Sequence, residues 1–270
     1  MRITVRFVLI AEVIIPSILF LSLCAQEVER KTEHFIVSCY NGVDTADKVA
    51  SIAEECYSRI TSELGLPKRS GFWRWDKRIK IRIYKNFDDF KKATNAPEWA
   101  GGRSSMRERE IATWLGAGDF ENSVLPHEMA HLILRDYFGA EKKIPLWLAE
   151  GIAQWVEPSK RAEAKKGILE GDPEKLFPLK DFWKKHDSCF SGNEAILFYR
   201  QSLSIVAFLM DYGGAYAFGI LCRKLKDGKN VEDALRFAYP QIARTIAVLE
   251  QQWLEHEKTN FHQEMIKEGR

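Results

Sequence analysis

Two histidines four positions apart enclose a glutamate in the segment His127-Glu128-Met129-Ala130-His131. On a helix, residues at this spacing share one face, so both imidazoles can bind a single metal ion. Glu128 lies about 100° around the helix axis, which places its carboxylate beside the ion and not on it. A helix is expected here because Pro126 suits a first helical turn and Gly139 suits a helix end.

This spacing predicts a particular chemistry. Zinc held by two histidines and one carboxylate keeps a fourth position for water, as catalytic zinc sites do. The metal would acidify that water, and Glu128 would accept its proton. The chain holds six histidines, and random order at its composition gives about 0.01 copies of the pattern. A helix with two hydrogen-bonded core histidines is the alternative explanation, and hydrolytic zinc chemistry is the one we favour.

A third metal ligand is expected from Glu150, which follows His131 by 19 positions. It lies in the apolar segment 144–156, where an unpaired glutamate is costly to bury. The alternative is a surface glutamate on an amphipathic helix. Two other glutamates, Glu141 and Glu157, are expected in solvent, because lysines follow the first and Pro-Ser-Lys follows the second.

With this third ligand the sequence resembles the gluzincin metallopeptidases, which combine H-E-x-x-H with a glutamate ligand on a following helix. The segment Pro145-Leu146-Trp147-Leu148-Ala149-Glu150-Gly151-Ile152-Ala153 is similar to the second signature of the thermolysin-like peptidase MA domains. The resemblance covers roughly residues 34–255. It implies that His127, His131 and Glu150 bind one zinc ion and that Glu128 is the general base. It implies no particular substrate.

Hydrophobic periodicity predicts an α+β fold. Strands are expected at 34–38, 79–84 and 110–115, and helices at 44–64 and 86–94. The chain after residue 122 has helical patterns at 176–185, 195–212, 215–225, 231–237 and 242–257. The resemblance implies a small mixed sheet packed on the zinc-binding helix, followed by a C-terminal helical lobe with an active-site cleft between them. The peptidase domain would span 34–257, divided into an α/β part (34–157) and a helical part (158–257).

The two ends of the chain differ from this domain. Arginines at positions 2 and 6, an apolar stretch and small residues before a polar run predict a signal peptide at 1–25. A lipoprotein signal with Cys24, or an uncleaved membrane anchor, are the alternatives. Residues 26–33 are expected to form a tether and 258–270 a charged tail. We therefore expect export to the periplasm, the medium or the outer side of a membrane.

An exported chain can form disulfides. Four cysteines follow the predicted cleavage site, and they are either paired or buried and free: Cys39, Cys56, Cys189 and Cys222.

Further residues are candidates for supporting roles. Gluzincins commonly use a Tyr or His of the helical lobe to stabilise the oxyanion, which makes Tyr199 a candidate second catalytic residue and His186 its rival. Gln154 and Asp136 are candidates to contact a metal ligand. The strand at 110–115 precedes the metal helix, where gluzincin-like enzymes place an edge strand that pairs with peptide backbone, and a simple buried strand is the alternative.

The balance of charges limits the partners. The 40 basic and 38 acidic residues give a net charge of +2, which offers no case for nucleic acid. A peptide or protein substrate is expected, with membrane contact only through the N-terminal segment. An aminopeptidase or another zinc hydrolase is one alternative, and a catalytically weak, zinc-stabilised peptide-binding module is the other.

Overall fold

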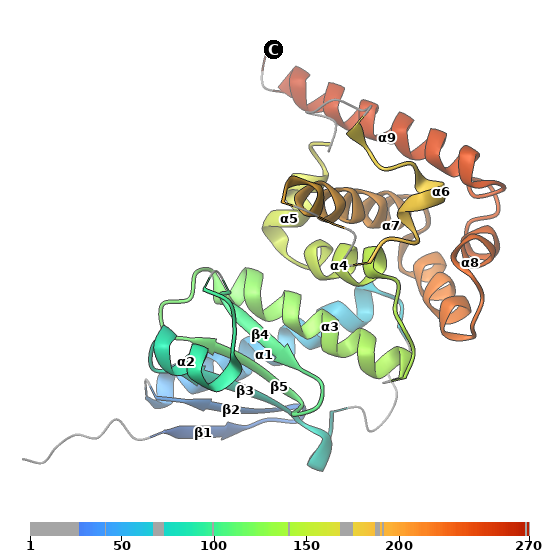
Figure 1. Cartoon of the computed structure of the whole chain (residues 1–270). Coiled ribbons are helices and arrows are strands. Elements are labelled where there is room, and N and C mark those ends of the chain that lie inside the picture. Colours follow the sequence, from blue (N-terminus) through green and yellow to red (C-terminus); the bar gives the residue numbers. More distant parts are fainter. Residues whose placement is uncertain are drawn as a thin grey trace, which may run out of the picture.

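A five-stranded mixed sheet occupies the first half of the molecule (Figure 1). The strands are β1 Val28–Lys31, β2 Phe35–Cys39, β3 Ile79–Tyr84, β4 Gly102–Ser105 and β5 Glu110–Trp114. Their order is β1-β2-β3-β5-β4, with β2, β3 and β5 parallel and the two outer strands antiparallel to their neighbours. The α+β prediction is confirmed.

The structure is a computed structural model. It describes residues 27–267, apart from 41, 67–72, 99, 140, 168–174, 187–189 and 191, together with residue 269. The predicted signal peptide at 1–25 and Cys189 therefore lie outside the described residues.

Helices cover both faces of the sheet. Ile79, Ile81 and Ile83 alternate into the main core, which the sheet shares with α1 (Val43–Glu63) and α3 (Leu125–Phe138). The other face carries α2 (Phe87–Thr94), which packs over a smaller cluster that includes Phe90 and Ala112. A 3-10 turn at Trp75–Lys77 precedes β3, and a π-helical turn at Phe120–Val124 leads into α3.

The second half of the described chain is helical. Its helices are α4 Leu146–Trp155, α5 Pro158–Ala164, α6 Leu179–Phe182, α7 Asn193–Lys226, α8 Val231–Ala238 and α9 Ile246–Lys267. The long helix α7 contains a break at Gly214, whose φ of 60° separates the two segments that the sequence predicts. Among the described helices, α7 is the one long and apolar enough to cross a membrane, but 61% of its most apolar window is buried, as in a core helix.

The two halves share one core. Buried residues from the sheet, such as Ile81, belong to the same cluster as Leu132 of α3, Phe208 of α7 and Trp253 of α9. In Figure 1, α3 lies between the sheet and the helical lobe. The metal-binding candidates of α3 are therefore held on both sides by packed elements.

Several predicted boundaries are wrong. The segment 26–33, expected to be a tether, contains β1, an edge strand whose charged residues, alternately half-buried and exposed, are within reach of solvent. The expected tail at 258–270 continues α9 as far as Lys267. The helix expected at 176–185 shrinks to the four residues of α6.

Two of the described cysteines lie in the core as thiols. Cys56 and Cys222 are buried free thiols. Burial raises the pKa of the Cys56 thiol to about 11 and that of Cys222 to about 12. Both are therefore inert core residues under ordinary conditions.

Candidate metal centre

Helix α3 directs its two histidines toward the helical lobe. Met129, Leu132 and Ile133 of α3 are buried in the core, which leaves His127 and His131 on the opposite side of the helix. The Nε2 atoms of these histidines lie 3.3 Å apart. A proline in the first turn begins α3 and Gly139 caps its end, as predicted from the sequence.

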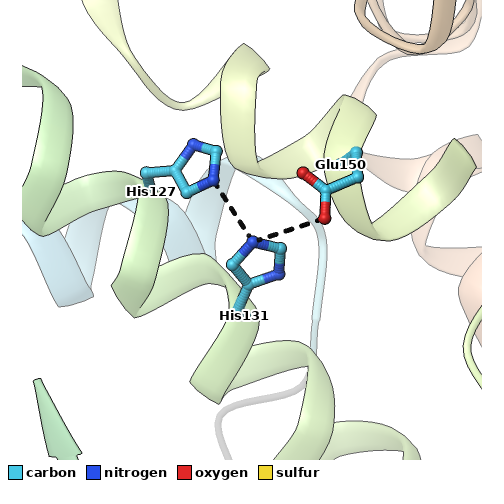
Figure 2. A group of neighbouring side chains, drawn as sticks. All are labelled: His127, His131 and Glu150. Carbon is cyan, nitrogen blue, oxygen red and sulfur yellow. Dashed lines mark hydrogen bonds and ion pairs between the residues drawn. The ribbon is translucent and has the colours of Figure 1, made fainter. Parts of the chain in front are cut away.

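Helix α4 brings Glu150 to the same point. Its Oε1 lies 3.8 Å from Nε2 of His131, and one donor atom from each of the three residues lies within 4.8 Å of the others. Figure 2 shows the three side chains pointing toward one another from two helices. The structure thus brings together the three residues predicted as metal ligands.

These distances fit a tetrahedral zinc ion. Zinc lies about 2.0–2.1 Å from histidine nitrogen and carboxylate oxygen, so tetrahedral donors are separated by roughly 3.3–3.5 Å. The observed 3.3 and 3.8 Å agree with that geometry after small side-chain rotations. The side chains of His127, His131 and Glu150 remain 26%, 26% and 20% exposed, so water and ligands can reach them.

A buried glutamate stabilises the orientation of His127. Nδ1 of His127 lies 2.8 Å from Oε1 of Glu157, and Ser123 Oγ donates to the other carboxylate oxygen at 2.6 Å. The Glu157 side chain is only 7% exposed, so the expectation that it lies in solvent is wrong. An Nδ1–H bond to this carboxylate leaves the lone pair of Nε2 free for a metal.

Glu157 lies beyond the end of α4, at the residue that precedes α5, and its Pro-Ser-Lys flank gave no sign of burial. Glu141, the other glutamate expected in solvent, is exposed.

The two histidines have opposite protonation tendencies. Burial alone would lower the pKa of His127, but the hydrogen bond to Glu157 and the nearby carboxylates outweigh it and raise that pKa. Burial, reinforced by the charge of His127, lowers the pKa of His131 to about 3. His131 therefore keeps a free lone pair at any ordinary pH.

A cavity of about 530 Å³ opens over the donor atoms. His127, His131 and Glu150 line it together with Glu128 and Tyr199, so it brings the predicted catalytic and metal-binding residues to one space. Glu128 borders the cavity and lies outside the three-residue donor group, as its helical position predicts. His186 lies on a different cavity, which adjoins the first at His131.

Most residues that line the cavity come from the predicted α/β part, and Lys160 and Tyr199 come from the predicted helical part. Gln154 of α4 donates from Nε2 to the backbone oxygens of Glu150, at 3.2 Å, and Tyr199, at 2.9 Å. It thereby joins α4 to α7. A Cβ on Gly151 would lie 2.5 Å from the backbone oxygen of Ser202, so only glycine permits this approach of the two helices.

Asp136 serves a different part of the fold. It accepts a hydrogen bond from Trp73 Nε1 and pairs with Arg109 at 3.3 Å, which ties the turn between β4 and β5 to α3. Its described side-chain contacts are therefore with Trp73, which precedes β3, and with Arg109 of the β4–β5 hairpin, and not with the candidate metal ligands.

The strand bordering the cleft is β4, and the assignment of the edge strand to 110–115 is wrong. β5 lies between β3 and β4, whereas β4 ends the sheet order and contributes Gly102, Arg103 and Ser104 to the cavity wall. The sequence did not predict this strand, because two glycines at its start and its polar residues are typical of a turn. A Cβ on Gly102 would lie 2.3 Å from Val124 Cγ1, so the glycine allows β4 to approach the start of α3.

The comparison with known proteins agrees with this geometry. The chain matches no curated protein sequence. Residues 65–258, which are 194 of its 270 residues, match the family model of the peptidase MA superfamily. The matched stretch includes α3, α4 and α7, the helices that line the cavity. The chain therefore belongs to the peptidase MA superfamily, whose members are typically metal-dependent peptidases.

Proposed function

We propose that the protein is an exported, zinc-dependent peptidase that cuts within peptide chains. The observation that carries this proposal is the group of three donor atoms within 4.8 Å of one another, in an open cavity that Glu128 also lines. Two imidazoles and one carboxylate are a donor set typical of catalytic zinc and uncommon in structural zinc sites.

Each residue has a defined part in this reaction. His127, His131 and Glu150 would hold the zinc ion, which would supply Lewis acidity when bound. Glu128 takes the proton from the attacking water and later delivers it to the leaving amine. The Tyr199 hydroxyl donates a hydrogen bond to the oxygen of the scissile carbonyl as negative charge develops there.

The edge of β4 would bind the peptide backbone. It is the last strand of the sheet order and borders the cavity through Gly102–Ser104, so an extended peptide can add to it as a further strand. Backbone pairing of this kind provides affinity with little sequence preference.

Room on both sides of the donors favours an endopeptidase over an aminopeptidase. The cavity of about 530 Å³ adjoins a second cavity of about 620 Å³, and Ser104 and His131 line both. A peptide can therefore extend in both directions from the metal-binding residues. An aminopeptidase site, by contrast, closes where the substrate begins.

A library of unstructured peptides, incubated with the zinc-loaded protein and analysed by mass spectrometry, tests this function. We expect internal cleavages with the parent protein. The Glu128→Gln variant keeps the size of the side chain but not its basicity, so we expect it to retain zinc and lose about 10²–10⁴-fold in rate. An inactive parent, or equal cleavage by both proteins, would refute the proposal.

A further inference from the structure

We propose that the second cavity is a subsite for a carboxylate-bearing segment of the peptide substrate. This inference rests on the proposed peptidase function, because it assigns a substrate class to one arm of the same cleft. The cavity measures about 620 Å³. It adjoins the cavity of about 530 Å³ over the donor atoms, called the metal cavity below, and Ser104 and His131 line both. A substrate held at the metal would therefore extend directly into it.

Cations from separate parts of the fold converge on this cavity. Arg135 comes from α3, Lys143 from the segment before α4, and Lys185 from the segment after α6. No acidic side chain of the described residues lines it. The cavity over the donor atoms, in contrast, is lined by Glu128, Glu150 and Glu157 together with Arg103 and Lys160. Among the described lining residues, the second cavity thus carries cations without carboxylates, whereas the first carries charges of both signs.

These cations are available to a ligand. Within the described part of the chain, Arg135, Lys143 and Lys185 form no ion pair, although many of the protein's other arginines and lysines do. Arg135 donates only a long hydrogen bond, 3.5 Å, to the backbone oxygen of Lys142. Nζ of Lys185 lies 4.2 Å from the ring centre of Phe177 and 5.6 Å from that of Phe190, so aromatic rings restrain the position of its ammonium group.

The floor beneath these charges is apolar. It includes Leu132, Leu134, Ile144, Leu146 and Trp183, of which Leu132, Leu134 and Trp183 are buried. Arg135 and Lys143 are themselves exposed, so a charge pair formed there stays partly screened by water. The apolar floor accommodates the methylene stem of a glutamate or the last side chain of a peptide, which a fully solvated positive surface would not do.

The carboxylate that occupies the cavity can come from two sources: an aspartate or glutamate side chain, or the C-terminus of the peptide. The test therefore uses a neutral peptide that the enzyme cleaves, scanned with Glu against Gln at each position and made with a free or an amidated C-terminus. The enzyme is the full zinc-loaded protein. The variants Arg135→Gln, Lys143→Gln and Lys185→Gln each remove one charge from the cavity. Lys184→Gln is the matched control, since Lys184 is exposed, lies outside the cavity and pairs with Asp181 at 3.7 Å.

We expect kcat/KM to favour the carboxylate over its neutral counterpart at one position or at the C-terminus. Each cavity variant is expected to reduce this preference by up to about fivefold, the scale of one partly exposed ion pair, and added salt to reduce it further. Cleavage of the neutral peptide, and all rates of the Lys184→Gln control, are expected to change little. Absence of any preference, or a preference that all three variants retain, would overturn the proposal.

A binding measurement tests the subsite independently of the peptidase activity. The same peptides, labelled for fluorescence anisotropy, are titrated onto the zinc-loaded Glu128→Gln protein, which requires no turnover. Selective binding of the carboxylate peptides without cleavage by the parent protein supports the subsite and refutes the peptidase. Cleavage by the parent without selective binding supports the peptidase and refutes the subsite, and failure of both measurements refutes both.

Discussion

Nδ1 of His127 lies 2.8 Å from a carboxylate oxygen of Glu157, while the other oxygen of Glu157 accepts a hydrogen bond from Ser123. This pair joins the start of α3 to the junction between α4 and α5. The carboxylate therefore favours the tautomer of His127 that leaves Nε2 free for a metal, and it links the two helices that carry the candidate metal ligands.

Replacement of Glu157 is expected to weaken zinc binding. In Glu157→Ala the imidazole loses its hydrogen-bond partner, and we expect the zinc dissociation constant to rise about 10–100-fold. Glu157→Gln keeps an acceptor oxygen and is expected to recover part of this loss. Competition with a chromophoric chelator measures the constant. Glu141→Gln, at an exposed glutamate, is the control; equal affinities for all four proteins would remove Glu157 from the site.

Gly151 is expected to be essential for the packing of α4 on α7. A methyl group there would lie 2.5 Å from the backbone oxygen of Ser202 and 2.6 Å from Val206 Cγ2, so a helix must move. We expect Gly151→Ala to lower the free energy of unfolding by about 1–3 kcal/mol. Urea denaturation measures this change. Gly118→Ala, where a methyl group meets open space, is the matched control, and equal stability of the two variants would contradict the close approach.

Much of this arrangement could be predicted from the sequence because it depends on local periodicity. The spacing of His127 and His131 needs only a helix, and the apolar surroundings of Glu150 need only a second one. Ile79–Tyr84 alternates so regularly that β3 has the predicted bounds. These features do not depend on which distant segment packs against them.

The features that the sequence did not reveal depend on tertiary contacts. Glu157 precedes a Pro-Ser-Lys sequence that is typical of solvent, yet His127 and Ser123 bury it. β4 has the composition of a turn and becomes a strand only because β5 pairs with it. Asp136 looks like a candidate partner for a ligand on α3, but Arg109 from the hairpin binds it. Local patterns hold no information on such pairings.

Tyr199 lines the metal cavity, and its hydroxyl is our candidate for the oxyanion donor. Tyr199→Phe removes one oxygen and keeps the ring, so we expect unchanged zinc content and melting temperature. The loss is expected in kcat, by roughly 10²-fold, the scale seen when one oxyanion donor is removed. Steady-state kinetics and a melting curve measure both quantities. An unaltered kcat would exclude Tyr199 and direct attention to His186, which lines the adjoining cavity.

Export predicts a defined N-terminus. We expect the mature chain to begin near Gln26, because a charged start, an apolar run and small residues precede it. N-terminal sequencing of the protein recovered from the exported fraction measures this. A chain beginning at a lipid-modified Cys24 would indicate anchoring, and an intact Met1 would contradict cleavage.

Zinc stoichiometry tests the central claim most directly. His127, His131 and Glu150 each offer one donor atom within 4.8 Å of the others, so the purified protein is expected to hold about one zinc ion per chain. Elemental analysis of the parent and of His131→Ala, dialysed side by side, makes the measurement. The account predicts one zinc per chain in the parent and close to none in the variant. A parent without zinc under zinc-replete conditions, or a variant with undiminished zinc, would contradict it.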